Sequence, residues 1–186
     1  MKEKVFILLI GSVLTFSCTQ SAERSEERKL GAETIADAIS ETRVDVDFKD
    51  FGPEPFVFNI EEYTTQNETY RTSIWTGEYM QMTVMSIPAG GDIGEEMHPD
   101  IDQFLRVEAG SGIMQMGDEE GVFNFEERVE HDFAVFIPAG KWHNLINDSD
   151  EPLKVYSIYA PGEHPRNTVH QTQEEGIAAH EAHHNH

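Results

Sequence analysis

From residue 44 onward, apolar residues occur in short runs rich in Val, Ile, Phe, Tyr and Thr, and Gly, Pro, Asn and Asp separate these runs. This pattern is typical of an all-β domain. The predicted strands cover residues 56–59, 69–76, 80–87, 103–109, 112–116, 122–127, 134–137, 142–147 and 153–159. Short strands in this number, without an internal repeat, favour a single jelly-roll barrel.

Side chains alternate between the two faces of a strand, so residues two apart share a face. Gln103 shares one face of its predicted strand with Leu105 and Val107, and His143 shares one with Leu145. Gln103 and His143 are therefore expected to lie on the same interior surface as core residues. The alternation predicts a polar pocket inside the barrel.

The amino terminus has the form of a signal peptide. Residues 5–16 are a short apolar run beside lysines, too short to span a bilayer. The single cysteine, Cys18, follows closely, and residues 14–18 resemble a bacterial lipobox. We expect residues 1–17 to be a lipoprotein signal peptide and Cys18 to carry a lipid that holds the protein at the bacterial cell envelope, periplasmic or surface-exposed. An ordinary signal peptide with an incidental cysteine is the alternative.

Two polar segments flank the predicted barrel. Residues 18–43 are expected to be a tether that contains a short amphipathic helix over residues 30–40. Residues 173–186 are expected to be a disordered, His-rich tail that binds metal ions at most loosely. The barrel domain is then predicted to span residues 44–172.

The chain is strongly acidic, with a formal net charge of −22 from 13 Lys and Arg against 35 Asp and Glu. Phosphate backbones and anionic lipid surfaces would be repelled, which argues against nucleic-acid binding and against adhesion through a basic patch. The expected partner is therefore a small molecule, and membrane attachment is expected only through the lipid on Cys18.

Four candidate metal ligands occur in two spaced motifs, Gly90-x5-Glu96-x-His98-x4-Gln103-x6-Gly110 and Pro138-x-Gly140-x2-His143-x3-Asn147. Glu96 and His98 are two residues apart, so an extended backbone would project both from one face. Two nitrogen and two oxygen donors suit one divalent ion, Fe, Mn, Zn or Ni. Glu95 is the rival of Glu96, and Asp102 is the rival of Gln103.

This double motif resembles that of the cupin superfamily, whose motifs are G-x5-H-x-H-x(3,4)-E-x6-G and G-x5-P-x-G-x2-H-x3-N. The resemblance covers residues 51–170 and implies a double-stranded β-helix, the cupin jelly-roll barrel, with metal ligands Glu96, His98, Gln103 and His143. Glu96 stands where the family has histidine, and Gln103 stands where it has glutamate. The set of four ligands therefore keeps one negative charge, but Glu96 carries it and the residue at the position of Gln103 does not. A homodimer, common among cupins, is a further expectation that no residue here demonstrates.

Within the superfamily, Ser73-Ile-Trp-Thr-Gly77, Glu96-Met-His-Pro99 and Pro138-Ala-Gly-Lys-Trp-His-Asn144 resemble segments of bacterial single-cupin proteins labelled mannose-6-phosphate-isomerase-like. That resemblance implies isomerase-type chemistry on a sugar or sugar derivative. An Fe(II)-dependent dioxygenase and a non-catalytic sugar-binding module of the envelope are the alternatives, because one barrel supports many reactions.

Several side chains are candidates for proton transfer or substrate binding beside the metal. Proton transfer is assigned to Glu96, Tyr156 and His164, and Glu96 is either a permanent ligand or a base. Substrate binding is assigned to Arg71, Trp75, Tyr159 and His170. Packing in the core or a place on the surface is the alternative for Arg71, Trp75 and the two tyrosines.

Overall fold

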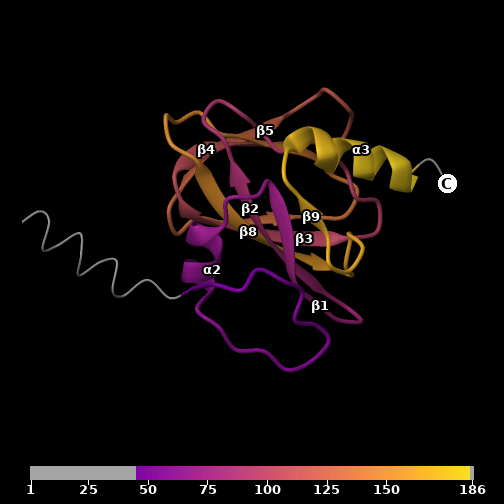
Figure 1. The fold of residues 1–186 in the computed structure, drawn as a ribbon. Helices are drawn as coiled ribbons and strands as arrows, with labels where there is room; N and C mark the ends of the chain where they lie inside the picture. Colours follow the sequence, from indigo (N-terminus) through magenta and orange to yellow (C-terminus); the bar gives the residue numbers. More distant parts are fainter. Residues whose placement is uncertain (1–44, 185–186) are drawn as a thin grey trace, which may run out of the picture. The chain divides into compact units, whose positions relative to one another are not determined.

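Two antiparallel sheets form the barrel (Figure 1). The larger sheet has the strand order β6-β3-β8-β2-β1-β9, and the smaller sheet has the order β5-β4-β7. Their bounds are β1 (Arg71–Thr76), β2 (Gln81–Ile87), β3 (Asp102–Ala109), β4 (Ser111–Gly117), β5 (Phe125–Glu130), β6 (Ala134–Ile137), β7 (Trp142–Ile146), β8 (Leu153–Ala160) and β9 (Val169–His170). The predicted all-β jelly roll is confirmed.

This computed structural model describes residues 45–184. The predicted signal peptide, the lipidated Cys18 and the helix at 30–40 lie outside the described residues. No helix in the described part of the chain is long and apolar enough to cross a membrane.

The main core lies on the inner faces of the strands. Leu105 and Val107 of β3, Leu145 of β7 and Val155 of β8 are fully buried there. Gln103 is buried on the same face of β3 as Leu105, as the alternation predicted. Polar residues at the ends of these strands therefore enter an apolar interior.

A second apolar cluster lies on the other face of the larger sheet. Ile74 and Val84 are fully buried there, under the aromatic side chains of residues 48–63. The predicted strand at 56–59 is wrong. Asn59 caps helix α2 (Ile60–Gln66) by accepting the backbone N–H groups of Glu61 and Glu62, while the ring of Phe58 packs on Tyr63 at 4.8 Å. Side-chain capping outweighs the strand preference of the Phe-rich run.

The carboxyl-terminal segment is ordered, so the prediction of a disordered tail is wrong for residues 173–184. They form helix α3 (Gln173–His184), which follows β9 (Figure 1). The Gln173 amide donates to Asp92 at 2.5 Å, and Gly176 lies against the ring of Tyr70. The helix docks through a small residue and a hydrogen bond, which apolar periodicity does not reveal.

Candidate metal centre

Backbone pairing brings Glu96 and His143 together. The two residues form an isolated antiparallel bridge, in which Glu96 N–H donates to His143 O at 3.0 Å and His143 N–H donates to Glu96 O at 2.9 Å. Residues that exchange both hydrogen bonds face each other directly, and their side chains lie on the same side. As a result, Oε1 of Glu96 lies 3.5 Å from Nε2 of His143.

His98 completes a group of three. Its carbonyl accepts the backbone N–H of Gly140 at 2.8 Å, and its Nε2 lies 3.6 Å from Oε1 of Glu96. All three candidate ligand atoms lie within 4.8 Å of one another, and Glu96, His98 and His143 are 7%, 2% and 0% exposed. Ligand atoms about 2.1 Å from a shared ion lie about 3.0–3.5 Å apart, so the group needs little movement to bind one.

Each imidazole directs Nε2 toward Glu96 and is held by a partner at its second ring nitrogen, Nδ1. Nδ1 of His143 lies 3.0 Å from the carbonyl of Lys141, to which it donates its N–H. Nδ1 of His98 lies 3.5 Å from Oε1 of Glu163. Partners of this kind fix the tautomer and turn the Nε2 lone pair toward a metal. Both histidines are therefore arranged as metal ligands through Nε2.

Gln103 offers a fourth donor. Its amide N–H donates to the hydroxyl of Ser157 at 3.2 Å, while its Oε1 is buried without a hydrogen-bond partner among the described residues. A buried acceptor left without a partner is costly, and binding to a cation would satisfy it. The amide oxygen suits the predicted role of Gln103, which stays a prediction.

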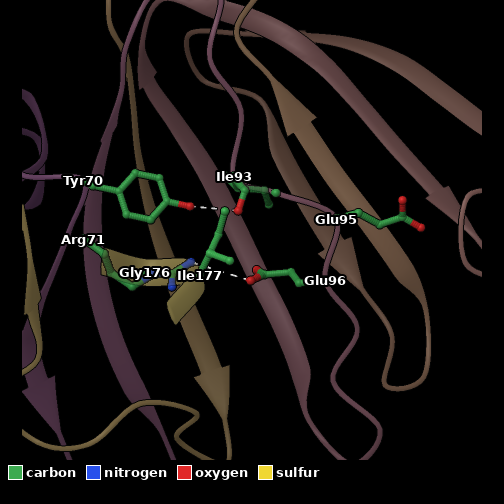
Figure 2. A pocket seen from close by; sticks show the side chains of 8 residues that line it. Tyr70, Arg71, Ile93, Glu95, Glu96, Gly176 and Ile177 are labelled. Atoms are coloured by element: carbon green, nitrogen blue, oxygen red, sulfur yellow. Dashed lines mark hydrogen bonds and ion pairs between the residues drawn. The ribbon is translucent and has the colours of Figure 1, made fainter. Parts of the chain in front are cut away.

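The two rival residues are engaged elsewhere. Glu95 is exposed and accepts the backbone N–H of Gly121 at 2.5 Å, and Figure 2 shows its carboxylate pointing away from Glu96. Asp102 is also exposed and accepts the backbone N–H of Ala139 at 3.0 Å. Neither carboxylate belongs to the cluster.

A buried cation faces the cluster from β1. Arg71 is 2% exposed, and its guanidinium lies 3.7 Å from Oε2 of Glu96 (Figure 2). Both residues line a cavity of about 130 Å³ that Ile177 of α3 also borders. Burial acts to raise the pKa of Glu96, but His143, His98 and Arg71 outweigh it and hold that pKa well below its usual range. Glu96 is therefore a carboxylate, the form that binds a metal ion.

The rings of Tyr159, His164 and His170 form a series of contacts that begins at His98. The ring of Tyr159 lies 5.7 Å from that of His98 and 5.1 Å from that of His164, and His164 lies 6.5 Å from His170. The side-chain amide of Gln81 holds the His164 backbone, accepting its N–H and donating to its carbonyl, both at 2.8 Å. The structure thus places Tyr159 and Arg71 beside the cluster, His164 behind Tyr159, and His170 next to His164.

Two predicted site residues lie elsewhere. Tyr156 is three positions from Tyr159 on β8, so it points to the opposite face, where it packs with Ile74 in the outer cluster. A bulge in β1 interrupts the alternation before Trp75, whose indole N–H donates to the carbonyl of Glu54 at 2.9 Å. The predictions of catalytic Tyr156 and substrate-binding Trp75 are therefore corrected.

Sequence reasoning missed Glu163 and Gln81. Glu163 follows β8 in a Pro- and Gly-broken segment that matches no motif, and its position after the last long strand is the one signal for it. Gln81 carries no motif either. Its role depends on a contact with a residue 83 positions away, which spacing does not predict.

Known proteins resemble this chain over the barrel. The family model of the cupin domain matches residues 83–159. Protein YrkC of Bacillus subtilis (strain 168) is 53% identical over 131 residues, 70% of each chain. Protein L612 of Acanthamoeba polyphaga mimivirus is 38% identical over 111 residues, 59% of this chain and 68% of that protein.

A solved structure agrees with the described fold. The crystal structure of BH2720 from Bacillus halodurans is 53% identical in sequence, with a TM-score of 0.69 over 70% of this chain and 99% of that chain. The names of these relatives state no activity. The similarity therefore supports the fold and the family of this chain and does not identify a reaction. Its sheets, its motifs and these relatives show that the chain belongs to the cupin superfamily.

Proposed function

We propose that this protein is a metal-dependent enzyme that isomerises a small hydroxylated carbonyl compound, a sugar or sugar derivative. The observation that carries the proposal is the group of Glu96 Oε1, His98 Nε2 and His143 Nε2, buried within 4.8 Å of one another. Gln103 Oε1 is assigned as the fourth donor. Fe, Mn, Zn and Ni all suit this donor set.

A divalent ion held by these residues would polarise a carbonyl oxygen of the substrate and stabilise the negative charge that develops there. Isomerisation also requires that a proton leave one carbon and reach its neighbour. The protein must therefore supply a base and an acid beside the ligands.

His164 and Tyr159 suit these two tasks. Burial first, and then the charge of Arg71, hold the pKa of His164 well below its usual range, so its imidazole is neutral and can accept a proton. Burial raises the pKa of the Tyr159 hydroxyl to about 12, so it keeps its proton. His164 Nε2 would take the proton from the hydroxyl-bearing carbon and return it to the former carbonyl carbon. Tyr159 would protonate the former carbonyl oxygen and take a proton back from the neighbouring hydroxyl.

An Fe(II)-dependent dioxygenase is the second candidate. Two histidines and one carboxylate are the ligand set of many non-haem iron oxygenases, and Glu96, His98 and His143 match it. The dioxygenase has no evident use for the acid–base pair of His164 and Tyr159. We therefore place the isomerase first.

The test is hydrogen exchange from solvent, followed by proton NMR. The protein is loaded with Mn, Fe, Zn or Ni in turn and incubated with mannose and fructose in deuterated water. We expect metal-dependent deuterium incorporation next to the carbonyl, slowed about 10²- to 10⁴-fold by His164→Ala. Tyr156→Phe is the matched control, because Tyr156 packs on the far face of β8. Oxygen consumption with Fe(II) and no deuterium exchange would select the dioxygenase.

A further inference from the structure

A larger pocket of about 410 Å³ lies between the segment 163–170 and helix α3. Its polar wall contains Glu163, His164, Thr168 and His170, and Ala179 and Ala182 of α3 form the opposite wall. Pockets of this size hold small organic ligands. The two alanines leave room that longer side chains on the helix would fill.

This pocket adjoins the metal cluster. Glu163 lines it, and the carboxylate of Glu163 lies 3.5 Å from Nδ1 of the ligand candidate His98. His164 lines it too, and its ring packs edge-on against Tyr159, which in turn packs edge-on against His98. The pocket is therefore bordered by Glu163, which contacts the cluster, and by His164, which packs on a neighbour of the cluster.

The polar wall has unused hydrogen-bonding capacity. Nε2 of His164 and Nδ1 of His170 are buried and have no hydrogen-bond partner among the described residues. Burial and the nearby charge of Arg71 lower the pKa of both imidazoles, so both are neutral. A neutral imidazole offers one N–H donor and one lone pair, which matches the donor and acceptor character of hydroxyl groups.

The charges around the pocket disfavour an anion. No Lys or Arg is among its described lining residues, while Glu163 contributes a carboxylate. The nearby cation, Arg71, is already paired with Glu96 at 3.7 Å. A phosphate group would therefore meet a negative charge without a free positive partner, in a chain whose net charge is −22.

We propose that this pocket is the subsite for the uncharged, hydroxylated end of the substrate, so that the protein takes free sugars or polyols in preference to phosphorylated ones. His170 hydrogen-bonds to substrate hydroxyls, Ala179 and Ala182 shape the opposite wall, and His164 stays the base at the reacting end. The inference rests on the proposed function, in which the reacting end of the substrate would lie at the metal. The pocket would hold the other end of the same substrate.

The test is calorimetric titration of the manganese-loaded protein with mannose, fructose and their 6-phosphates. We expect the free sugars to bind at least about tenfold more tightly than their phosphates. Ala179→Leu and Ala182→Leu, which fill the pocket, should each weaken free-sugar binding at least about tenfold. Ala178→Leu is the matched control, because Ala178 is exposed on the same helix and does not line the pocket.

Manganese content, measured on every sample, separates this inference from the proposed function. Loss of manganese from the unaltered protein would overturn the metal assignment itself. Full manganese content with equal or tighter binding of the phosphates would overturn the subsite alone. Full manganese content with no binding of any of the four sugars, or with no effect of Ala179→Leu and Ala182→Leu, would do the same.

Discussion

Glu96 and His143 face each other across an antiparallel bridge, and their side-chain ligand atoms lie 3.5 Å apart. Two backbone hydrogen bonds fix this separation, so it does not depend on flexible side chains alone. His143 is further held by the carbonyl of Lys141. Such pre-organisation lowers the cost of binding an ion, because the ligands are already ordered before it arrives.

Replacement of Glu96 by Ala should abolish stoichiometric metal binding, because it removes the carboxylate that lies between the two histidines. We expect metal affinity to fall by more than about 100-fold, beyond the usual effect of changing a residue that only supports a ligand. Glu95→Ala is the matched control, since Glu95 is exposed and bonded to Gly121. Elemental analysis of purified protein measures the outcome.

His-rich terminal segments also capture metal ions, so the comparison should be made with His180, His183, His184 and His186 all replaced by Ala. If Glu96→Ala keeps a full equivalent of metal in that background, the assignment of Glu96 is wrong. If Glu95→Ala loses metal as well, the choice between the neighbouring carboxylates is wrong.

Glu163→Gln should weaken metal binding about 10- to 100-fold without abolishing it. The carboxylate faces Nδ1 of His98 at 3.5 Å, and its loss removes the partner that orients this imidazole and makes it more basic. Competition with a metal chelator measures the change. Glu174→Gln is the control, because Glu174 is exposed on α3. An unchanged affinity in Glu163→Gln would show that His98 needs no such partner.

Metal binding should release protons at neutral pH. Burial alone would lower the pKa of His98, but the carboxylates of Glu163 and Glu96 outweigh it and raise this pKa to about 9 in the metal-free protein. His98 is therefore protonated at pH 7, and a metal must displace that proton. Affinity should rise with pH up to about 9 and then level off.

The same shift gives the metal-free protein a pH-dependent stability. Because the folded pKa of His98 is raised, the contribution of His98 to the free energy of unfolding is fully present below the unfolded pKa of 6.5 and is lost as pH rises through about 9.

The release of protons on metal binding is measured by calorimetry in buffers of different ionisation enthalpy. This should detect about one proton released per metal at pH 7 and fewer at pH 9.5. Equal proton release at both pH values would contradict the assignment.

The barrel and most of its strands could be predicted from the sequence, because period-two alternation and turn residues are local signals. β6 (Ala134–Ile137) has the predicted bounds, and the turn residue Asp132 has a φ of 73°. Motif spacing also predicts the grouping of Glu96, His98 and His143, whose candidate ligand atoms lie within 4.8 Å of one another. These features depend on near neighbours and on the geometry of regular strands.

The remaining features depend on tertiary contacts that leave no periodic trace. The prediction for Tyr156 is wrong because an aromatic residue on a strand can face either side, and the outer cluster supplies a second apolar face. The prediction for Trp75 is wrong because a bulge breaks the alternation. Glu163 belongs to no motif, and its partner, His98, is 65 positions earlier and is reached through an irregular segment, so spacing does not predict the contact.

Gly176→Ala should loosen helix α3, although alanine is the better helix former by about 1 kcal/mol. A Cβ on Gly176 would lie 2.6 Å from Cε1 and 3.1 Å from Cδ1 of Tyr70. Tyr70 is 3% exposed, and its hydroxyl donates to Ile93 at 2.8 Å, so its ring has little freedom to move away (Figure 2). Backbone hydrogen exchange over residues 173–184 should therefore become faster. Ala178→Gly, which lowers helix propensity at an exposed position, separates the two effects. Faster exchange in Gly176→Ala than in Ala178→Gly means that contact with Tyr70 decides the docking of α3, and slower exchange in Gly176→Ala than in the unaltered protein means that helix propensity decides it.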